Sequence, residues 1–342
     1  MLRKMTTWIR WAGRPCLLPA TLVARPAHET GAGKDESEIL LGGQAVIEGV
    51  MMRAPHSYCV AVRTPGGIMQ KREGLCRPQD RWRGWALPGL RGLATIGQSL
   101  VLGLRALRYS ADVALEQESK QSGKKQELPG WLLAVQVTFS LLFFIFLYKY
   151  VPLVIATQFE RRGLEGGWLG FNLIDGLVRI LLFLGFLGLV SLWSDIRRVF
   201  EYHGAEHMVV YNWEAKRPVT IANARTFTPE HPRCGTSFLM VVLLVALVVY
   251  ALVPVQSFGL RLLVRILLLP VIAGVSYEII RAAGKRPQST FWRALVTPGL
   301  WLQRAITTRQ PSDDQIEVAI HALEGALEIE RATEQPVPAT VN

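Results

Sequence analysis

The sequence predicts a mainly α-helical membrane protein with four transmembrane helices, a small cytoplasmic β-containing unit and amphipathic cytoplasmic helices. Half of the 342 residues are hydrophobic and the mean hydropathy is +0.24, which favours a membrane protein over a soluble one. Two pairs of spans are expected, within 131–193 and within 237–280. Their four apolar runs have lengths typical of membrane-spanning helices, at 131–151, 168–193, 238–255 and 260–280.

The net charge indicates which partners to expect, and the cysteine content indicates the redox compartment. The chain carries a net charge of +11 and contains four cysteines. Basic residues of membrane proteins collect in cytoplasmic loops beside acidic lipid headgroups, so we expect the lipid bilayer as the anionic partner and no nucleic acid. No two cysteines form a Cys-x-x-Cys pair, which argues against a zinc ribbon or a disulfide scaffold and fits a reducing compartment.

The first 130 residues are expected to lie outside the membrane. Residues 1–39 predict a flexible tail and no signal peptide, because their apolar portion is short and is broken by Pro19. Residues 40–130 predict a cytoplasmic β unit, marked by a Pro-Gly-Gly hairpin signal at 65–67, and an interfacial helix. Its uncharged segment, 92–104, would rise only about 20 Å as a helix, too little for a span.

The distribution of Lys and Arg predicts the orientation of the spans. Basic residues are plentiful before, between and after the two helix pairs, in 1–130, 194–236 and 281–342. They are sparse in 156–167 and absent from 256–259. Because Lys and Arg collect in cytoplasmic loops, we expect both termini and the 194–236 loop to be cytoplasmic in a multi-pass protein.

Four charged residues lie inside the predicted spans. Asp175 and Arg179 are four residues apart, as are Arg261 and Arg265. Charges at this depth are rare and mark functional sites, which suggests transport. The alternative is a local ion pair, with arginines whose long side chains reach the interface.

Residues 281–331 predict amphipathic helices on the cytoplasmic side, followed by a disordered tail at 332–342. Ser312 and Gln315 fit a capping box. Apolar residues then recur at helical spacing, at Ile316, Ile320, Leu323 and Leu327. This stripe needs a partner surface, which is either the cytoplasmic part of the same chain or a protein partner.

The loop at 194–236 holds three of the six histidines and carries the candidate chemistry. On a helix, His203 and His207 project from one face, so both imidazoles can bind one metal ion. With Glu206 they form the His-x-x-Glu-His pattern of the inverted zincins, in which the glutamate activates water. A divalent metal ion, zinc, is therefore the expected cofactor, and Glu206 is the expected general base.

A third metal ligand is expected nearby. His231 and Cys234 are three residues apart at the end of the same loop, and both side chains bind borderline or soft divalent metals. Further candidates are Glu48, Glu201 and Glu278. The alternative is structural: His203 and Glu206 make interfacial hydrogen bonds and Cys234 is buried and inert.

Several long motifs in this chain belong together. They are GGQAVIEGVMMR at 42–53, YHGAEH at 202–207, HPRCGTSF at 231–238, and Pro298-Gly299 with Gln303 and Thr307-Thr308. Together they resemble the YqhQ-like family of bacterial polytopic membrane proteins of unknown function, some of which are described as predicted metal-dependent enzymes. The resemblance covers roughly residues 40–330 and implies a bacterial inner-membrane location, but no reaction. Met208 departs from the basic residue expected in similar sequences.

The favoured interpretation is a metal-dependent hydrolase that acts on a peptide or a lipid-linked substrate at the cytoplasmic membrane face. His203, His207 and either His231 or Cys234 would bind the metal, and Glu206 would be the general base. The alternative is a non-enzymatic membrane scaffold or assembly factor that binds a protein partner through its C-terminal helix. A transporter, based on the charges inside the spans, is the third candidate.

Overall fold

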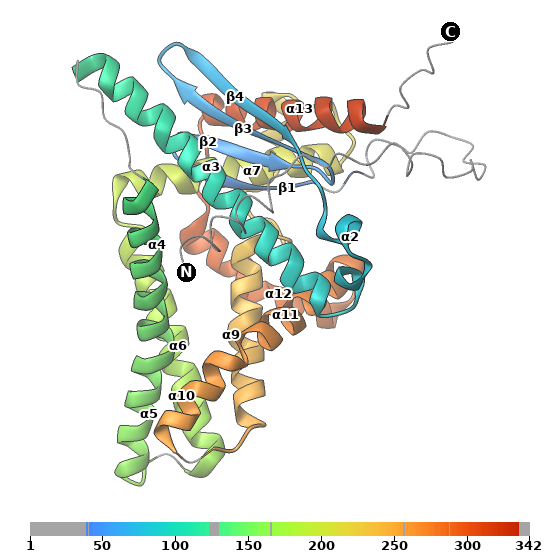
Figure 1. Cartoon of the computed structure of the whole chain (residues 1–342). Helices are drawn as coiled ribbons and strands as arrows, with labels where there is room; N and C mark the ends of the chain where they lie inside the picture. The colour runs from blue at the N-terminus through green and yellow to red at the C-terminus, as the bar shows by residue number, and fades with distance from the viewer. Residues whose placement is uncertain are drawn as a thin grey trace.

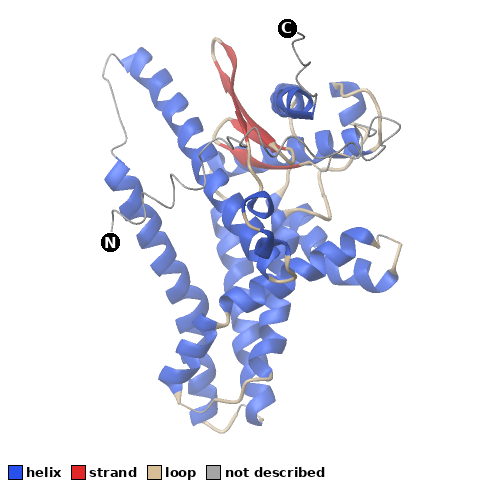
Figure 2. Cartoon of the chain, turned by 45° about the vertical axis from the view of Figure 1, so that its right-hand side comes forward, coloured by secondary structure: helices blue, strands red, loops and turns tan. Residues whose placement is uncertain are grey.

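The computed structural model describes residues 39, 41–122, 130–164, 166–255, 257–286 and 288–334. A small β-sheet packs among helices at one end of a set of long apolar helices (Figures 1 and 2). The described chain is mostly helical, as the sequence predicts. The tails predicted at 1–39 and 332–342 lie almost wholly outside the described residues.

The β unit is an antiparallel meander of four strands in sequence order: β1 (Gly42–Val46), β2 (Gly49–Arg53), β3 (Ser57–Thr64) and β4 (Gly67–Gly74). Thr64 pairs with Gly67, so Pro65 and Gly66 make a two-residue hairpin turn. Gly67 has a φ of +120°, which favours glycine over any other residue. The predicted hairpin and the small β unit are confirmed.

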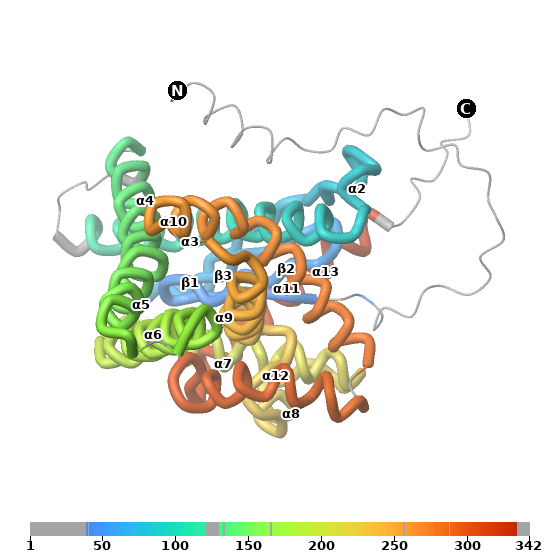
Figure 3. Tube along the Cα trace, turned by 90° about the horizontal axis from the view of Figure 1, so that it is seen from below, coloured from blue at the N-terminus to red at the C-terminus, as the bar shows by residue number. Residues whose placement is uncertain are grey.

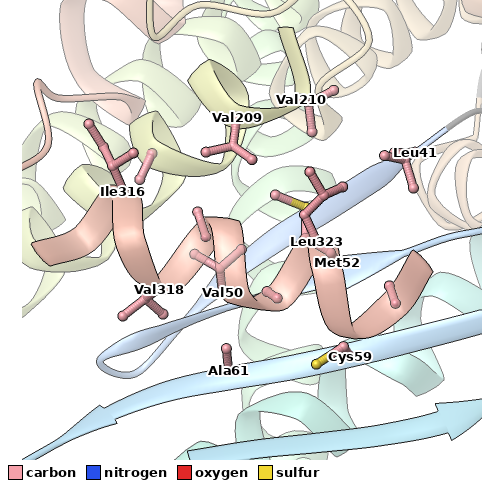
Figure 4. Packing of buried hydrophobic residues seen from close by; sticks show 14 of the residues in the cluster. Leu41, Val50, Met52, Cys59, Ala61, Val209, Val210, Ile316, Val318 and Leu323 are labelled. Carbon is pink, nitrogen blue, oxygen red and sulfur yellow. The ribbon is translucent and has the colours of Figure 1, made fainter. Parts of the chain in front are cut away.

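Helices cover both faces of this sheet. Successive strand residues point to opposite sides, so apolar residues on both sides need a covering helix. On one face, Val60 and Val62 pack against α3 (Leu90–Ser122). On the other, Cys59 and Ala61 pack against α7 (Ser194–Glu214) and α13 (Asp313–Glu334). Figure 4 shows this second core, with Val50 and Met52 of β2 beside Val318 and Leu323 of α13.

The apolar stripe of α13 finds its partner surface within the same chain. Ile316, Leu323 and Leu327 are buried in the core that α13 shares with α7 and the sheet. The helix begins with the predicted capping box: Ser312 N–H donates to Gln315 Oε1 at 2.9 Å, and Gln315 N–H donates to Ser312 Oγ at 3.4 Å. Of the two expected partner surfaces, the structure therefore supplies the internal one.

Glu330 joins the end of α13 to the sheet and should make stability depend on pH. Its buried carboxylate accepts hydrogen bonds from His56 N–H, at 2.8 Å, and from Ser57 Oγ, at 2.9 Å. Burial works to raise the pKa of Glu330, but the bonds from His56 and Ser57 lower it below its usual value. The contribution to stability is complete above the unfolded-state pKa of about 4.3 and is lost as the pH falls through the lower folded-state pKa.

Replacing this carboxylate should therefore flatten the acid limb of the stability curve. We expect Glu330→Gln to lower the free energy of unfolding at pH 7 by about 1–3 kcal/mol, with a smaller further loss below pH 5 than in the wild type. Thermal unfolding between pH 3 and pH 7 measures both effects. Glu317→Gln is the matched control on the same helix, because its exposed pair with Arg63 contributes about 1 kcal/mol or less. Parallel pH curves for wild type and Glu330→Gln would contradict the assignment.

Two helices are long and apolar enough to cross a membrane. One is the continuous helix of 32 residues made by α4 (Gly130–Ile145), the π-helical turn η4 (Phe146–Tyr150) and α5 (Val151–Arg161). The other is α6 (Gly167–Val190), with 24 residues. Large apolar side chains along α4 remain exposed, which is consistent with contact with a lipid bilayer.

The other two expected spans are shorter or bent. α9 (Gly235–Ala251) has only 17 residues, and α10 (Phe258–Leu267) meets α11 (Leu269–Lys285) at 44°. Pro270 at the start of α11 lacks a backbone donor, which explains the bend. The described residues therefore contain two helices able to span a membrane, or up to three if the bent pair is one span, in place of the expected four. Figure 3 shows α5, α6, α9 and α10 from their far end.

The remaining elements connect the sheet to these apolar helices. α2 (Pro78–Arg81) and the 3₁₀-helix η3 (Arg83–Ala86) precede α3, which has 33 residues and extends well beyond the expected segment at 92–104. α3 continues because Leu102, Ala106 and Val113 bury one face against the sheet. The short α8 (Ile221–Ala224) lies in the loop after α7. α12 (Thr290–Leu302) and the π-helical turn η5 (Gln303–Thr307) lead to α13.

Candidate metal centre

α7 carries the histidines of the candidate centre. The segment is helical throughout, as its lack of proline predicts, and Asp195 places a negative charge in the first turn, where the helix dipole favours it. The i and i+4 spacing brings His203 and His207 to one face, with ring centroids 4.4 Å apart. Glu206 lies on the same side of the helix, one residue before His207.

Cys234 reaches these histidines from the start of α9. It is the N-cap of that helix, and its Sγ accepts a hydrogen bond from Thr236 N–H at 3.4 Å. The loop before it is held by the buried side chain of Gln303, which accepts from His231 N–H at 2.7 Å and donates to His231 O at 3.0 Å. The backbone of this loop is therefore fixed next to α7.

His203, His207 and Cys234 form a cluster of three potential metal ligands. One potential ligand atom from each residue lies within 4.8 Å of the other two. His203 Nε2 is 3.1 Å from Cys234 Sγ, within hydrogen-bond distance of sulfur. His207 and Cys234 are 2 % and 9 % exposed, so the ligand atoms are largely shielded from solvent.

Backbone carbonyls orient both imidazoles. His203 Nδ1 donates to Thr307 O at 2.7 Å, and His207 Nδ1 donates to Pro229 O at 2.6 Å. A carbonyl oxygen can only accept, so each Nδ1 carries a proton and each Nε2 is left to bind a ligand. Metal-binding histidines have this arrangement, in which the second nitrogen is held by a carbonyl or carboxylate.

The histidines and Cys234 shift one another's pKa values. Burial works to lower the pKa of His203, but the Cys234 thiolate beside it raises that pKa to about 9. Burial works to raise the pKa of Cys234, but His203 and His207 hold it well below its usual value. The two imidazoles therefore favour the thiolate of Cys234, which is the form of cysteine that binds metals.

Glu206 lies at the edge of the cluster. Its Oε2 is 3.6 Å from His207 Nε2, and the side chain is largely buried. β1 approaches closely at this point: a Cβ on Gly43 would lie 2.8 Å from Glu206 Cγ. The sheet thus forms a wall beside the carboxylate that the sequence predicts to be the general base.

His231 lies beside the cluster and outside it. Burial, and next the neighbouring His207, lower the pKa of His231 to about 4, so its ring is neutral. Its Nδ1 accepts from Arg233 N–H at 3.3 Å. Its buried Nε2 lies 3.6 Å from the Glu214 carboxylate and has no hydrogen-bond partner among the described residues. Of the two expected third ligands, the structure brings Cys234, and not His231, to the two histidines.

The three acidic candidates for a third ligand are used elsewhere. Glu48 pairs with Arg198 at the β1–β2 turn. Glu201 accepts from Gln315 Nε2 at 2.8 Å, and Glu278 pairs with Arg91. None of them belongs to the His203, His207 and Cys234 cluster.

Two residues that organise the centre were not singled out as site residues from the sequence. Gln303 is fully buried and fixes the His231 loop, and Gly204 lets the chain after η5 approach α7. A Cβ on Gly204 would lie only 2.1 Å from Arg309 O. The one sequence signal for Gln303 was its place in the motif at 298–308, and that motif contains no His, Cys, Asp or Glu to suggest a metal site.

The fold and the cluster define a mostly helical protein with apolar helices suited to membrane contact and with a buried His, His, Cys cluster beside a small sheet. The model of a family described as "protein of unknown function (DUF1385)" matches residues 87–329. The chain is 35% identical over 310 residues to the "uncharacterized protein YqhQ" of Bacillus subtilis (strain 168), covering 86% of this chain and 94% of that relative. The chain therefore belongs to this YqhQ-like family of unknown function. No solved structure matches it.

Proposed function

We propose that His203, His207 and Cys234 bind one divalent metal ion, zinc, and that the protein is a metal-dependent hydrolase. The observation that carries the proposal is the cluster of two imidazole nitrogens and one sulfur within 4.8 Å, with each Nδ1 held by a carbonyl. Catalytic zinc sites keep three protein ligands drawn from His, Cys and carboxylate side chains, and two histidines with one cysteine supply three ligands of these types.

The neighbouring residues fit hydrolysis. Zinc held by three protein ligands lowers the pKa of water at an open position and polarises carbonyl groups. Glu206, whose Oε2 lies 3.6 Å from His207 Nε2, would be the general base beside the bound metal. The Thr307 and Pro229 carbonyls would hold the two imidazoles in position as metal ligands.

The surroundings support a substrate that reaches the centre from the membrane. Cys234 caps an apolar helix, and the sheet adjoins Glu206, so the centre lies between the β unit and the apolar helices. A peptide or a lipid-linked molecule at the cytoplasmic face of a bacterial inner membrane is the proposed substrate class. The proposed topology is multi-pass with both termini cytoplasmic, on the distribution of Lys and Arg.

Metal analysis of purified, unchelated protein tests the centre. We expect close to one zinc per wild-type chain and less than about a tenth of that in the double variant His203→Ala and His207→Ala. His321→Ala is the matched control, because that histidine lies on α13 and contacts Gln70. Glu206→Gln should retain the metal and lose activity, whereas loss of metal would make Glu206 a ligand. A wild-type protein that is folded and lacks metal would sink the proposal and leave a thiol and imidazole pair.

A further inference from the structure

A cavity of about 310 Å³ lies between the first turns of α3 and the segment that leads into that helix. Its volume is within the range of small-molecule sites, which are lined mainly by apolar side chains. Its walls come from α2, η3 and α3, and they include Trp85, Leu90, Leu93, Ala94, Val101 and Arg81. We refer to this space as the α3 cavity. It shares no residue with the candidate metal centre.

An amide and a glycine shape the wall that α3 gives to this cavity. Gln98 Nε2 donates to Cys76 O at 2.7 Å, and Gln98 Oε1 accepts from Arg53 Nη2 at 2.5 Å. Gln98 therefore ties the segment before α2 to α3. At Gly97 an added Cβ would have no described atom within 4 Å, so there is open space beside the helix at this position. The space is bounded mainly by hydrocarbon, which suits an apolar ligand.

The residues next to this lining are aromatic, apolar or basic, and they are exposed. Trp82 and Leu87 are each 57% exposed. Arg83 is exposed and pairs with no acidic side chain of the described residues. The segment 77–91 has four arginines and one carboxylate, which is already in an ion pair. Tryptophan and arginine together are typical of the interface between membrane and water, where the ring contacts hydrocarbon and the guanidinium reaches the headgroups.

Contacts with α11 place the α3 cavity beside the apolar helices. Gly89 N–H donates to Glu278 Oε1 at 3.2 Å, and Arg91 pairs with the same carboxylate. Gly89 also lies against Gly274, where an added Cβ would be 3.2 Å from Gly89 O. Figures 1 and 3 show the start of α3 beside α11. The cavity is therefore close to a helix whose exposed apolar residues, such as Val275, suit contact with lipid.

An anionic phospholipid fits both parts of this site. An acyl chain makes no hydrogen bonds, so it suits a space walled by Leu90, Leu93 and Val101. A headgroup phosphate is negatively charged and accepts hydrogen bonds from guanidinium groups, and Arg81 lines the same cavity as the leucines. Anionic lipids are the ones that the cytoplasmic leaflet supplies to basic segments at its surface.

We propose that the α3 cavity binds an acyl chain of one anionic phospholipid, whose headgroup phosphate lies beside Arg81 and Arg83. This site differs from the general contact of apolar helices with a bilayer, because it takes one molecule and selects it by charge. The proposal does not depend on the metal centre.

Native mass spectrometry of the full-length protein, delipidated in detergent, tests this site. Wild-type protein should bind one dioleoyl phosphatidylglycerol, with an affinity about tenfold or more above that for dioleoyl phosphatidylcholine, because each arginine near an anionic headgroup adds affinity. Cys76 provides a second readout within the cavity itself. Phosphatidylglycerol should slow maleimide labelling of Cys76, measured by peptide mapping, and phosphatidylcholine at the same concentration should slow it less.

Two kinds of variant separate the headgroup from the chain. The double variant Arg81→Gln and Arg83→Gln should lower the affinity for phosphatidylglycerol by about tenfold or more and remove the preference over phosphatidylcholine. Gly97→Phe places a ring in the cavity and should lower the affinity for both lipids by about tenfold or more, because the acyl chain loses its apolar surroundings. The unfolding temperature of each variant shows that it is folded.

The matched controls are Gly185→Phe on α6, where an added Cβ has no described atom within 4 Å, and Arg108→Gln, on the exposed surface of α3 beyond the cavity. Both should bind the two lipids as the wild type does. The proposal fails if wild-type protein binds neither lipid or binds both equally, or if a folded Gly97→Phe variant keeps its affinity. Protection of Cys76 by glycerol phosphate alone, or full protection in lipid-free protein by the chain itself or a second copy, would also overturn it.

Discussion

Replacing Gly204 by alanine is expected to lower the free energy of unfolding by about 3 kcal/mol and to abolish metal binding. The added Cβ would lie 2.1 Å from Arg309 O, a backbone atom that cannot rotate away as a side chain would. The chain after η5 must then move off α7. That movement would break the bond from Arg309 N–H to Phe200 O and withdraw the Thr307 carbonyl from His203.

Chemical unfolding and metal content of the purified variant measure the two parts of this result. Gly97→Ala in α3 is the control, because no atom of the described part of the chain lies within 4 Å of a Cβ at that helical position. Alanine there should leave stability unchanged or raise it by up to about 1 kcal/mol. Equal behaviour of the two alanine variants would mean that the close approach of Arg309 to α7 is not required.

Replacing Gln303 by leucine should have the next largest effect on stability. The buried amide makes three hydrogen bonds, with His231 N–H, His231 O and Ser237 Oγ, at 2.7, 3.0 and 2.8 Å. Leucine has a similar volume and makes none of them. Buried groups left without partners cost about 1–3 kcal/mol each, so a loss of about 3 kcal/mol is expected.

The same substitution should weaken binding of the proposed metal ion, although Gln303 touches none of the three proposed ligands. The loop from Pro229 to Cys234 loses its internal support, and this loop supplies both the carbonyl that orients His207 and the sulfur ligand. Gln70→Leu, on the half-buried β4, serves as the control and should change stability by about 1 kcal/mol or less. If a folded Gln303→Leu variant bound metal with the affinity of the wild type, the loop would not need the hydrogen bonds of Gln303 to keep its shape.

Elements with local determinants could be predicted from the sequence. The turn at Pro65 and Gly66 needs only its own residues, and the capping box of α13 needs only Ser312 and Gln315. The spacing of His203 and His207 on one helix is likewise a local property. For each of these features, the residues that determine it lie within a few positions of one another, so the sequence pattern was sufficient to predict it.

Features that depend on distant contacts could not be predicted. His231 and Cys234 are three residues apart, and only the N-cap position of Cys234 and the bonds from Gln303 decide which of them reaches the histidines. The apolar run at 260–280 has the length of a span, but Pro270 divides it into two helices at an angle. α3 continues past the charged Arg105 because its other face meets the sheet.

The order in which the chain is synthesised bears on how this sheet becomes a folded unit. One face of β2 and β3 is covered by residues of α7 and of α13, the last helix described (Figure 4). A ribosome releases Cys59 and Ala61 some 250 residues before the α13 residues that cover them. The apolar face of these strands therefore stays uncovered until the apolar helices between β3 and α13 have been synthesised. Completion of the carboxyl end then closes the sheet and brings Thr307 to His203, so truncated chains would lack both the core and the candidate metal centre.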